Sequence, residues 1–439
     1  MRDFASLLPV ARGDEPADLV LAAARVINVF SGEIVEADIA IAGDRIAGVG
    51  EYRRGRNVVP LNGAFVAPGF IDAHLHIEST MLTPPEFARA VLPHGTTAVV
   101  ADPHEIANVH GLAGIRYMLD ASRDLPLSVY LMLPSCVPAT HLETGGAALS
   151  AADLSPLIDE PRVLGLAEMM NYPGAIHGDA AVLDKLRLGL RKRIDGHAPG
   201  VSGRALAAYV ACGVGTDHEC TTAAEAREKL QLGMTVLIRE GSAAQNLDAL
   251  LPLVTPRNAH RFCFCTDDRH PHDLVEEGHI DHVIRRAVQR GLDPISAIQM
   301  ATLFPAQTYG LSERGAIAPG RMADIVVFDD LQTPRPRQVY CRGRLTAEYG
   351  RCDASIAAGI APPTTHLRLP ADLTERSFAV AAPSDVRGIR VIGLTDRQIT
   401  TRCLIEPPCV RDGRLVADVG RDLLKLAVIE RHRGAGNIG

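Results

Sequence analysis

The sequence lacks any segment that is typical of a transmembrane helix or of a secretory signal peptide. No window reaches the length of about eighteen uncharged apolar residues that a membrane span needs. The N-terminus, MRDFASLLPVARGDEP, carries acidic residues early and shows no apolar segment followed by a small-residue cleavage site, so it does not resemble a secretory signal. We therefore expect a cytosolic protein with no membrane partner.

Paired cysteines and dense basic clusters are also missing. The nine cysteines are an odd number, stand in apolar surroundings and form no CxxC pair, which argues against a disulfide framework and a thiolate zinc site. The formal net charge is −7, from 45 basic and 52 acidic residues without a basic cluster, so a nucleic acid polymer is not an expected partner. Hydrophobic residues at 47% and charged residues at 22% are typical of a globular protein.

The chain of 439 residues is long enough for two or three domains. Residues 18–60 alternate apolar and polar positions between Gly, Asn and Asp, which predicts a small antiparallel β module, with its N-terminal part in residues 1–63. Residues 64–310 contain eight β-like runs that alternate with segments of helical period. This pattern predicts an α/β architecture, a (β/α)8 TIM barrel, although a doubly wound open sheet of eight strands is the alternative.

Three further segments follow the predicted barrel. Residues 311–355 are strand-like and punctuated by Gly and Pro, so we expect them to return and complete the β module as a small β-sandwich. The Pro-rich residues 356–375 are typical of a linker. Residues 376–439 begin another β-rich piece, which we expect to be an incomplete C-terminal α+β domain.

Potential metal ligands stand where five of the predicted strands end. In a TIM barrel the active site is built from these ends. A single HxH pair is more often incidental, but the coincidence over separate strands favours a site for two metal ions. In the stretch FIDAHLHIEST, alternate residues of a strand face the same side, so both histidines can hold one ion. The candidate ligands are His74, His76, Glu168, His197, His218 and Asp267.

Such a site predicts hydrolysis. Two ions roughly 3.5–4 Å apart can share a water molecule and lower its pKa until hydroxide forms at neutral pH. Asp267 is the candidate general base that later acts as an acid. His104, in VVADPHEIA, is either an acid or base at the same rim or a helix residue bonded to a backbone carbonyl. Glu78 and Ser79 face either substrate or solvent, and Arg239 either binds substrate or caps a loop.

The motifs resemble a known family. APGFIDAHLHIEST and GRMADIVVFD are similar to the amidohydrolase superfamily, while GLAEMMNYPG, DGHAPG, TDHECT and FCTDDRHP resemble its adenine deaminase family. The resemblance runs from about residue 20 to the end, and the family's chains continue beyond GAGNIG. It implies hydrolysis of adenine to hypoxanthine and ammonia, a step of purine salvage, at two divalent ions, usually manganese or iron. An all-nitrogen-and-oxygen ligand set is also compatible with zinc.

The resemblance also implies roles for single residues. The four histidines and Asp267 would be metal ligands, His104 would assist catalysis, and Glu168 would either bridge the metals or protonate N1 of the purine. The small-molecule partner would be adenine, and we expect a homo-oligomer. Two alternatives stay open: an amidohydrolase for another purine, a pterin or a cyclic amide, and a catalytically silent barrel scaffold.

Overall fold

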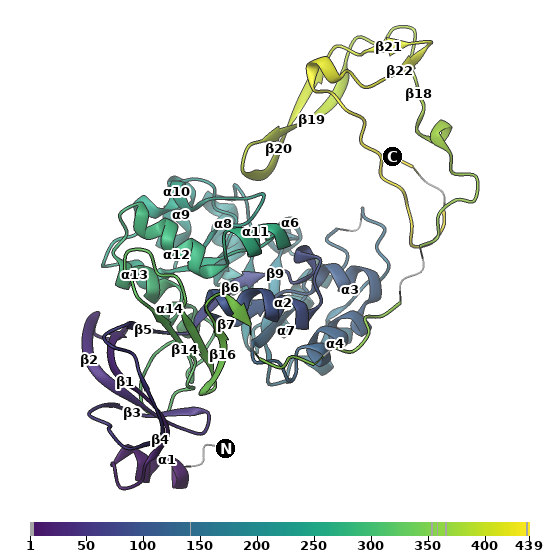
Figure 1. The fold of residues 1–439 in the computed structure, drawn as a ribbon. Helices are drawn as coiled ribbons and strands as arrows, with labels where there is room; N and C mark the ends of the chain where they lie inside the picture. The colour runs from purple at the N-terminus through teal and green to yellow at the C-terminus, as the bar shows by residue number, and fades with distance from the viewer. Residues whose placement is uncertain (1–3, 141, 353, 358, 365–366, 436–437) are drawn as a thin grey trace.

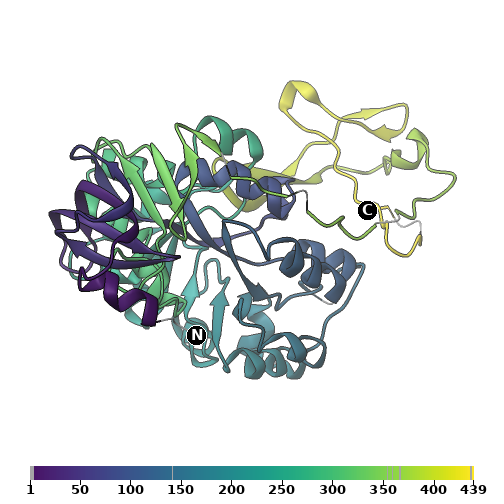
Figure 2. The ribbon, with the colours of Figure 1, turned by 60° about the horizontal axis from the view of Figure 1, so that its bottom comes forward.

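The computed structural model describes residues 4–439 apart from 141, 353, 358, 365–366 and 436–437. The chain forms a β module, a barrel and a C-terminal segment, which follow one another from one end of the molecule to the other (Figure 1). A view turned by 60° shows the β module and the C-terminal segment on opposite sides of the barrel (Figure 2). No helix among the described residues is long and apolar enough to span a bilayer.

The β module joins residues from both sides of the barrel segment in one sheet. β5 pairs antiparallel with β14, with Val66 opposite Val327, so the return strands complete the sheet begun at the N-terminus. Ile39, Ile41 and Ile325 are fully buried between its strands, as the alternating pattern predicts. The strands are β1 (Ala17–Asn28), β2 (Glu33–Ala42), β3 (Arg45–Gly50), β4 (Gly55–Pro60), β5 (Phe65–Pro68), β14 (Ile325–Phe328), β15 (Gln338–Cys341), β16 (Arg344–Glu348) and β17 (Arg351–Cys352), preceded by helix α1 (Phe4–Ala11).

Eight parallel strands close into a barrel. Within it, β6 to β10 pair in sequence and so do β11 to β13. The N–H of Gly215 donates to Ile194 O at 3.0 Å and joins β11 to β10, while the N–H of Asp267 donates to His74 O at 3.0 Å and joins the end of β13 to β6. Closure on both sides decides for the TIM barrel over the open sheet. The strands are β6 (Phe70–Leu75), β7 (Thr96–Ala101), β8 (Ser128–Leu133), β9 (Val163–Met169), β10 (Arg193–Gly196), β11 (Thr216–Asp217), β12 (Thr235–Arg239) and β13 (Phe262–Cys265).

Helices cover the outside of the barrel (Figure 1). Side-chain caps begin several of them where the sequence places Asp or Thr: Asp179 accepts from Val182 N at the start of α7, and Thr222 accepts from Glu225 N at the start of α9. The helices are α2 (Pro84–Val91), α3 (His104–His110), α4 (Leu112–Ala121), α5 (Ala151–Leu154), α6 (Tyr172–His177), α7 (Ala180–Gly189), α8 (Gly203–Ala211), α9 (Ala223–Gln231), α10 (Leu247–Leu250), α11 (Pro271–Glu276), α12 (Ile280–Gln289), α13 (Pro294–Met300) and α14 (Leu303–Thr308).

The first of the eight β-like runs predicted in residues 64–310 is FVAPGFIDAH at 65–74, and it divides between two sheets at Gly69. Its first part is β5 of the module and its second part is β6 of the barrel. A Cβ atom at Gly69 would lie 2.1 Å from Oγ1 of Thr97, so the crossing requires a residue without a side chain. The apolar sequence runs without a break from β5 into β6, so the close approach of Gly69 to Thr97 is what marks the junction between the two strands.

The C-terminal segment consists of short strands and single turns. Its largest element is the hairpin of β19 (Ile389–Thr395) and β20 (Gln398–Glu406), and its remaining strands are β18 (Val380–Ala381), β21 (Val410–Arg411) and β22 (Arg414–Leu415). No α-helix occurs among the described residues of 376–439, so the helical part of the expected α+β arrangement is not found there. The alternating, Gly- and Pro-interrupted sequence favours hairpins over helices.

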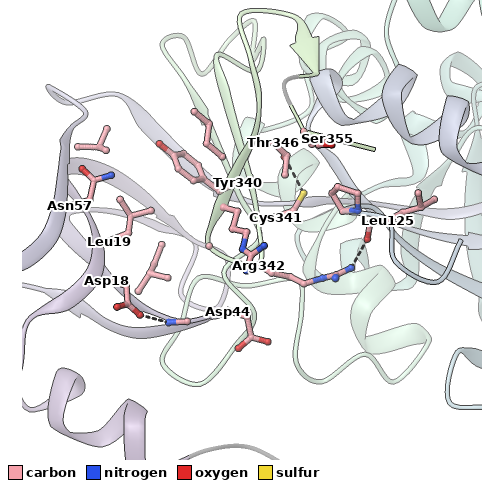
Figure 3. A pocket seen from close by; sticks show the side chains of 18 of the residues that line it. Asp18, Leu19, Asp44, Asn57, Leu125, Tyr340, Cys341, Arg342, Thr346 and Ser355 are labelled. Atoms are coloured by element: carbon pink, nitrogen blue, oxygen red, sulfur yellow. Dashed lines mark hydrogen bonds between the residues drawn. The ribbon is translucent and has the colours of Figure 1, made fainter. Parts of the chain in front are cut away.

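A groove of about 1020 Å³ lies between the β module and the barrel (Figure 3). Asp18, Leu19 and Asn57 line one side, and Arg342 crosses toward the barrel, where its Nη2 donates to Leu125 O at 2.8 Å. None of the histidines at the strand ends lines this groove. The candidate chemistry is therefore found at the other end of the barrel strands, where polar side chains converge.

Candidate metal centre at the barrel mouth

Four histidines from three strand ends gather at the mouth of the barrel. His74 lies in β6 with His76 just beyond it, His197 follows β10, and His218 follows β11. The rings of His74 and His218 stack with centroids 4.1 Å apart, and those of His74 and His76 meet edge to face at 4.9 Å. His74, His76 and His218 are at most 3% exposed. Such burial of imidazoles without an apolar role points to ligands.

The carboxylate of Glu168, from β9, stands between these histidines. Its Oε1 lies 3.3 Å from Nε2 of His76 and 3.8 Å from Nε2 of His74. Its Oε2 lies 2.7 Å from Nδ1 of His197 and 3.3 Å from Nε2 of His218. Each oxygen thus faces a different pair of imidazoles, which is the arrangement a bridging carboxylate needs.

Asp267 is held beside the first histidine pair by a strained turn. It lies two residues beyond β13 with φ of 56°, a left-handed conformation that costs a non-glycine residue about 1–2 kcal/mol. Two backbone bonds to β6 hold it there: its N–H donates to His74 O, and its O accepts from His76 N at 3.4 Å. Its Oδ1 lies 3.1 Å from Nε2 of His76, while its Oδ2 accepts from Nη1 of Arg239 at 2.8 Å.

The donor set fits divalent metal ions. Nε2 of His74 and Nδ1 of His218 are buried and have no hydrogen-bond partner among the described residues. Nδ1 of His76 donates to the carbonyl of Asp102 at 2.9 Å, which leaves the Nε2 lone pair directed into the site. Ligand atoms lie close enough to share an ion in several groups: His74 with His76 and Asp267, His74 with Glu168 and His218, and His197 with His218 and Glu219.

The electrostatics show that this cluster requires positive charge. Burial would lower the pKa of His76, but Glu105, Asp267 and Glu168 together raise it well above its usual range. Burial would raise the pKa values of the Glu168 and Asp267 carboxyls. His218 and neighbouring imidazoles nevertheless hold the pKa of Glu168 far below normal, and His76 does the same for Asp267. Protons on the imidazoles or bound cations can supply the charge, and a divalent ion would displace the protons.

His104 forms a pair with a carboxylate that sequence reasoning missed. Asp102 directly follows strand β7, and its Oδ2 accepts from Nδ1 of His104, the first residue of α3, at 2.9 Å. Nδ1 of His104 also lies 3.4 Å from Oε1 of Glu168. Burial would lower the pKa of His104, but Asp102 raises it to about 10, so this imidazole is a cation at neutral pH.

Glu219 is a second missed carboxylate, and it accounts for Arg239. Nη1 and Nη2 of Arg239 donate to Oε1 and Oε2 of Glu219 at 2.6 and 3.0 Å, and Nη1 also reaches Asp267. Both Arg239 and Glu219 are at most 1% exposed. Arg239 is therefore a buried anchor of the site's carboxylates, and contact with substrate stays a prediction. Asp102 and Glu219 each lie within two residues of a predicted histidine, which is the signal that could have found them.

Glu78 and Ser79 lie in a group of carboxylates at the rim. Oγ of Ser79 donates to Oε1 of Glu105 at 3.2 Å and to Asp268. Oε1 of Glu78 accepts from Ile106 N at 3.2 Å, and its other oxygen is buried without a partner among the described residues. Burial and the charge of Glu105 raise the pKa of Glu78 to about 8. A protonated carboxyl there is able to donate a hydrogen bond to a ligand.

Comparison with known proteins identifies the family. Residues 65–346 match the model of the amidohydrolase family. The chain is 46% identical over 435 residues to the adenine deaminase of Desulfatibacillum aliphaticivorans, covering 99% of this chain and 76% of that protein. It is 50% identical over 441 residues to adenine deaminase 2 of Carboxydothermus hydrogenoformans, covering 100% of this chain and 76% of that protein.

Solved structures of low sequence identity share the fold. The β-aspartyl dipeptidase of Fervidobacterium islandicum AW-1 matches with a TM-score of 0.57 and 16% identity over 76% of this chain and 98% of that one. The dihydropyrimidinase of Brevibacillus agri NCHU1002 matches with a TM-score of 0.58 and 12% identity over 77% of this chain and 96% of that one. The chain therefore belongs to the amidohydrolase family, in which its relatives at 46 to 50% identity are adenine deaminases.

Proposed function

We propose that the protein hydrolyses adenine to hypoxanthine and ammonia, a reaction of purine salvage. The observation that carries the proposal is the placement of Glu168, whose two oxygens each face a separate pair of histidines at the barrel mouth. Its relatives over nearly the whole chain bear the name adenine deaminase. In the reaction a bond forms between water oxygen and C6, the C6–N6 bond breaks, and nitrogen leaves as ammonia.

Two divalent ions, manganese or iron, are the proposed cofactors, with zinc compatible on ligand chemistry alone. His74, His76 and Asp267 would hold one ion, and His197 and His218 the other, with Glu168 between them. When bound, such ions lower the pKa of water and supply a nucleophile at neutral pH. His74 is buried, and its burial together with the charge of His218 lowers its pKa well below normal. His74 is therefore neutral and suited to binding a metal ion.

Asp267 is the proposed proton carrier. Burial would raise the pKa of Asp267, but the surrounding imidazoles keep it ionised, and Arg239 holds its Oδ2. Oδ1 is thus left facing the reaction centre, where it can accept a proton from water and return it to the departing amine. The strained backbone at Asp267 is consistent with a residue fixed for such a role.

Protonation of N1 is the second task, because attack at C6 develops negative charge on the ring. We assign this proton to His104, which Asp102 keeps as a cation beside Glu168. Glu168 itself, which lies within 4 Å of five imidazoles, would instead help to hold the two ions. Glu78 and Ser79 are proposed to contact the purine edge, since a protonated Glu78 can donate to a ring nitrogen. Arg239 already donates to three side chains and fits substrate binding less well.

The proposal is tested by measuring ammonia and hypoxanthine formed from adenine by the metal-loaded protein. Asp267→Asn should abolish most of the ammonia release, because the proton carrier is lost. The control is Asp184→Asn, which alters an exposed carboxylate on α7 and should leave the release unchanged. Light scattering on the same samples tests the expected homo-oligomer. Absence of ammonia from adenine by the loaded protein, with metal bound, would reject this substrate.

A further inference from the structure

The C-terminal hairpin contacts the barrel directly beside the site. The hairpin of β19 and β20 points toward the barrel (Figure 1), and its tip contacts the loop that follows β12. Gln245 N donates to Arg397 O at 3.1 Å, and Nδ2 of Asn246 donates to Oε1 of Gln398 at 3.1 Å. Two residues far apart in sequence, one in each part of the molecule, thus share a hydrogen bond at the edge of the barrel mouth.

Asn246 carries this contact inward. It is fully buried, and its Oδ1 accepts from Nε of Arg239 at 3.3 Å. An amide has one acceptor and one donor end, so the acceptor supplied by Gln398 stabilises the orientation in which Oδ1 of Asn246 faces Arg239. With the amide reversed, its NH2 group would face a guanidinium that can only donate, and both groups would lose a partner.

Arg239 in turn holds the carboxylates of the site. Its Nη1 reaches Oδ2 of Asp267 at 2.8 Å and Oε1 of Glu219 at 2.6 Å. The contacts therefore form a continuous series from Gln398 through Asn246 and Arg239 to Asp267. Each member except Gln398 is less than 9% exposed, so water competes poorly for these bonds.

We propose that Gln398 is a positioning residue for the reaction, by which the C-terminal hairpin orients the Asn246 amide and, through Arg239, the carboxylate of Asp267. The inference rests on the proposed role of Asp267 in the deamination of adenine. Because Gln398 acts on a group used in proton transfer rather than on substrate contacts, it affects kcat and leaves KM unchanged.

The test compares two variants of nearly equal size in the metal-loaded chain of 439 residues. Gln398→Met keeps the length of the side chain but removes the acceptor, and we expect kcat per bound metal to fall about fivefold, the effect of one hydrogen bond. Gln398→Glu keeps an acceptor at the same reach and should retain kcat within about twofold. The matched control is Ile399→Ala, a neighbour that is 43% exposed and points to the opposite face of the hairpin.

A double-mutant cycle completes the test. In an Asn246→Ala background, Gln398→Met should cause no further loss of kcat, because the link is already broken. If Gln398 had only a structural role, Gln398→Met and Gln398→Glu would lower kcat equally, together with the melting temperature or the metal content. Equal kcat for Gln398→Met and the wild type, equal losses in both Gln398 variants, or additive losses with Asn246→Ala would overturn the inference. Lack of ammonia release by the wild type would instead reject the proposed function.

Discussion

Replacement of Glu219 by Gln tests the electrostatic account of the site. Burial would raise the pKa of Glu219, but His218 and Arg239 lower it from 4.5 to about 2. At about 1.4 kcal/mol per pKa unit, this difference corresponds to about 3.5 kcal/mol of stability at neutral pH. The Gln variant loses that contribution and leaves Arg239 with Asp267 as its remaining carboxylate.

The pH dependence has a definite sign. The folded pKa lies below the unfolded one, so the stabilisation is complete above the unfolded value and is lost as pH falls toward 2. The difference in unfolding free energy between wild type and Glu219→Gln should therefore shrink by about 1.4 kcal/mol between pH 7 and pH 3.5. Urea unfolding of the metal-free proteins, followed by circular dichroism, measures it.

The control for this experiment is Glu86→Gln. Glu86 pairs with Arg89 on the surface of α2 with 53% of its side chain exposed, and such a pair contributes at most about 1 kcal/mol. A Glu219→Gln difference that is as small as the control, or that stays constant over this pH range, would show that the contacts with His218 and Arg239 do not lower the pKa of Glu219.

Three further predictions concern the proton donor, the metal ligands and the barrel core. Asp102→Asn should lower the pKa of the His104 imidazole from about 10, as measured by NMR titration, and an unchanged pKa would refute the pairing. Because that pKa is raised in the folded state, the stabilisation from the pair is complete below about pH 6.5 and is lost as pH rises toward 10. His74→Ala should reduce bound metal below two ions per chain by elemental analysis, and full occupancy would exclude His74 as a ligand. Leu237→Ala, in fully buried β12, should cost about 2–5 kcal/mol in urea unfolding, and a cost under 1 kcal/mol would contradict close packing there.

The barrel and the ends of its strands could be predicted because two signals agree. Hydrophobic runs located the strands, and a closed barrel brings the carboxyl ends of these runs to one rim, so His74 and Glu168 meet although 94 positions separate them. The C-terminal segment carried no such double signal. Its expected helical content rested on a domain type rather than on a periodic pattern, and the described residues form strands.

The carboxylates around the histidines could not be predicted in the same way. Glu219 and Asp102 stand beside predicted ligands, but an acidic residue at a strand end is also typical of a solvated loop. Burial and pairing distinguish the two cases, and both depend on closure of the barrel. Arg239 illustrates this most clearly, because only the folded structure shows its guanidinium enclosed between Glu219 and Asp267.

The central claim is that the histidines and carboxylates of the barrel mouth hold two divalent ions for the hydrolysis of adenine. The most direct test is to titrate metal-free protein with Mn²⁺ and follow the initial rate of hypoxanthine formation together with bound metal. We predict no turnover without metal and a rate that rises until about two ions are bound per chain, the number that a two-metal site holds. Turnover in the metal-free protein, or two bound ions without any conversion of adenine, would contradict the account.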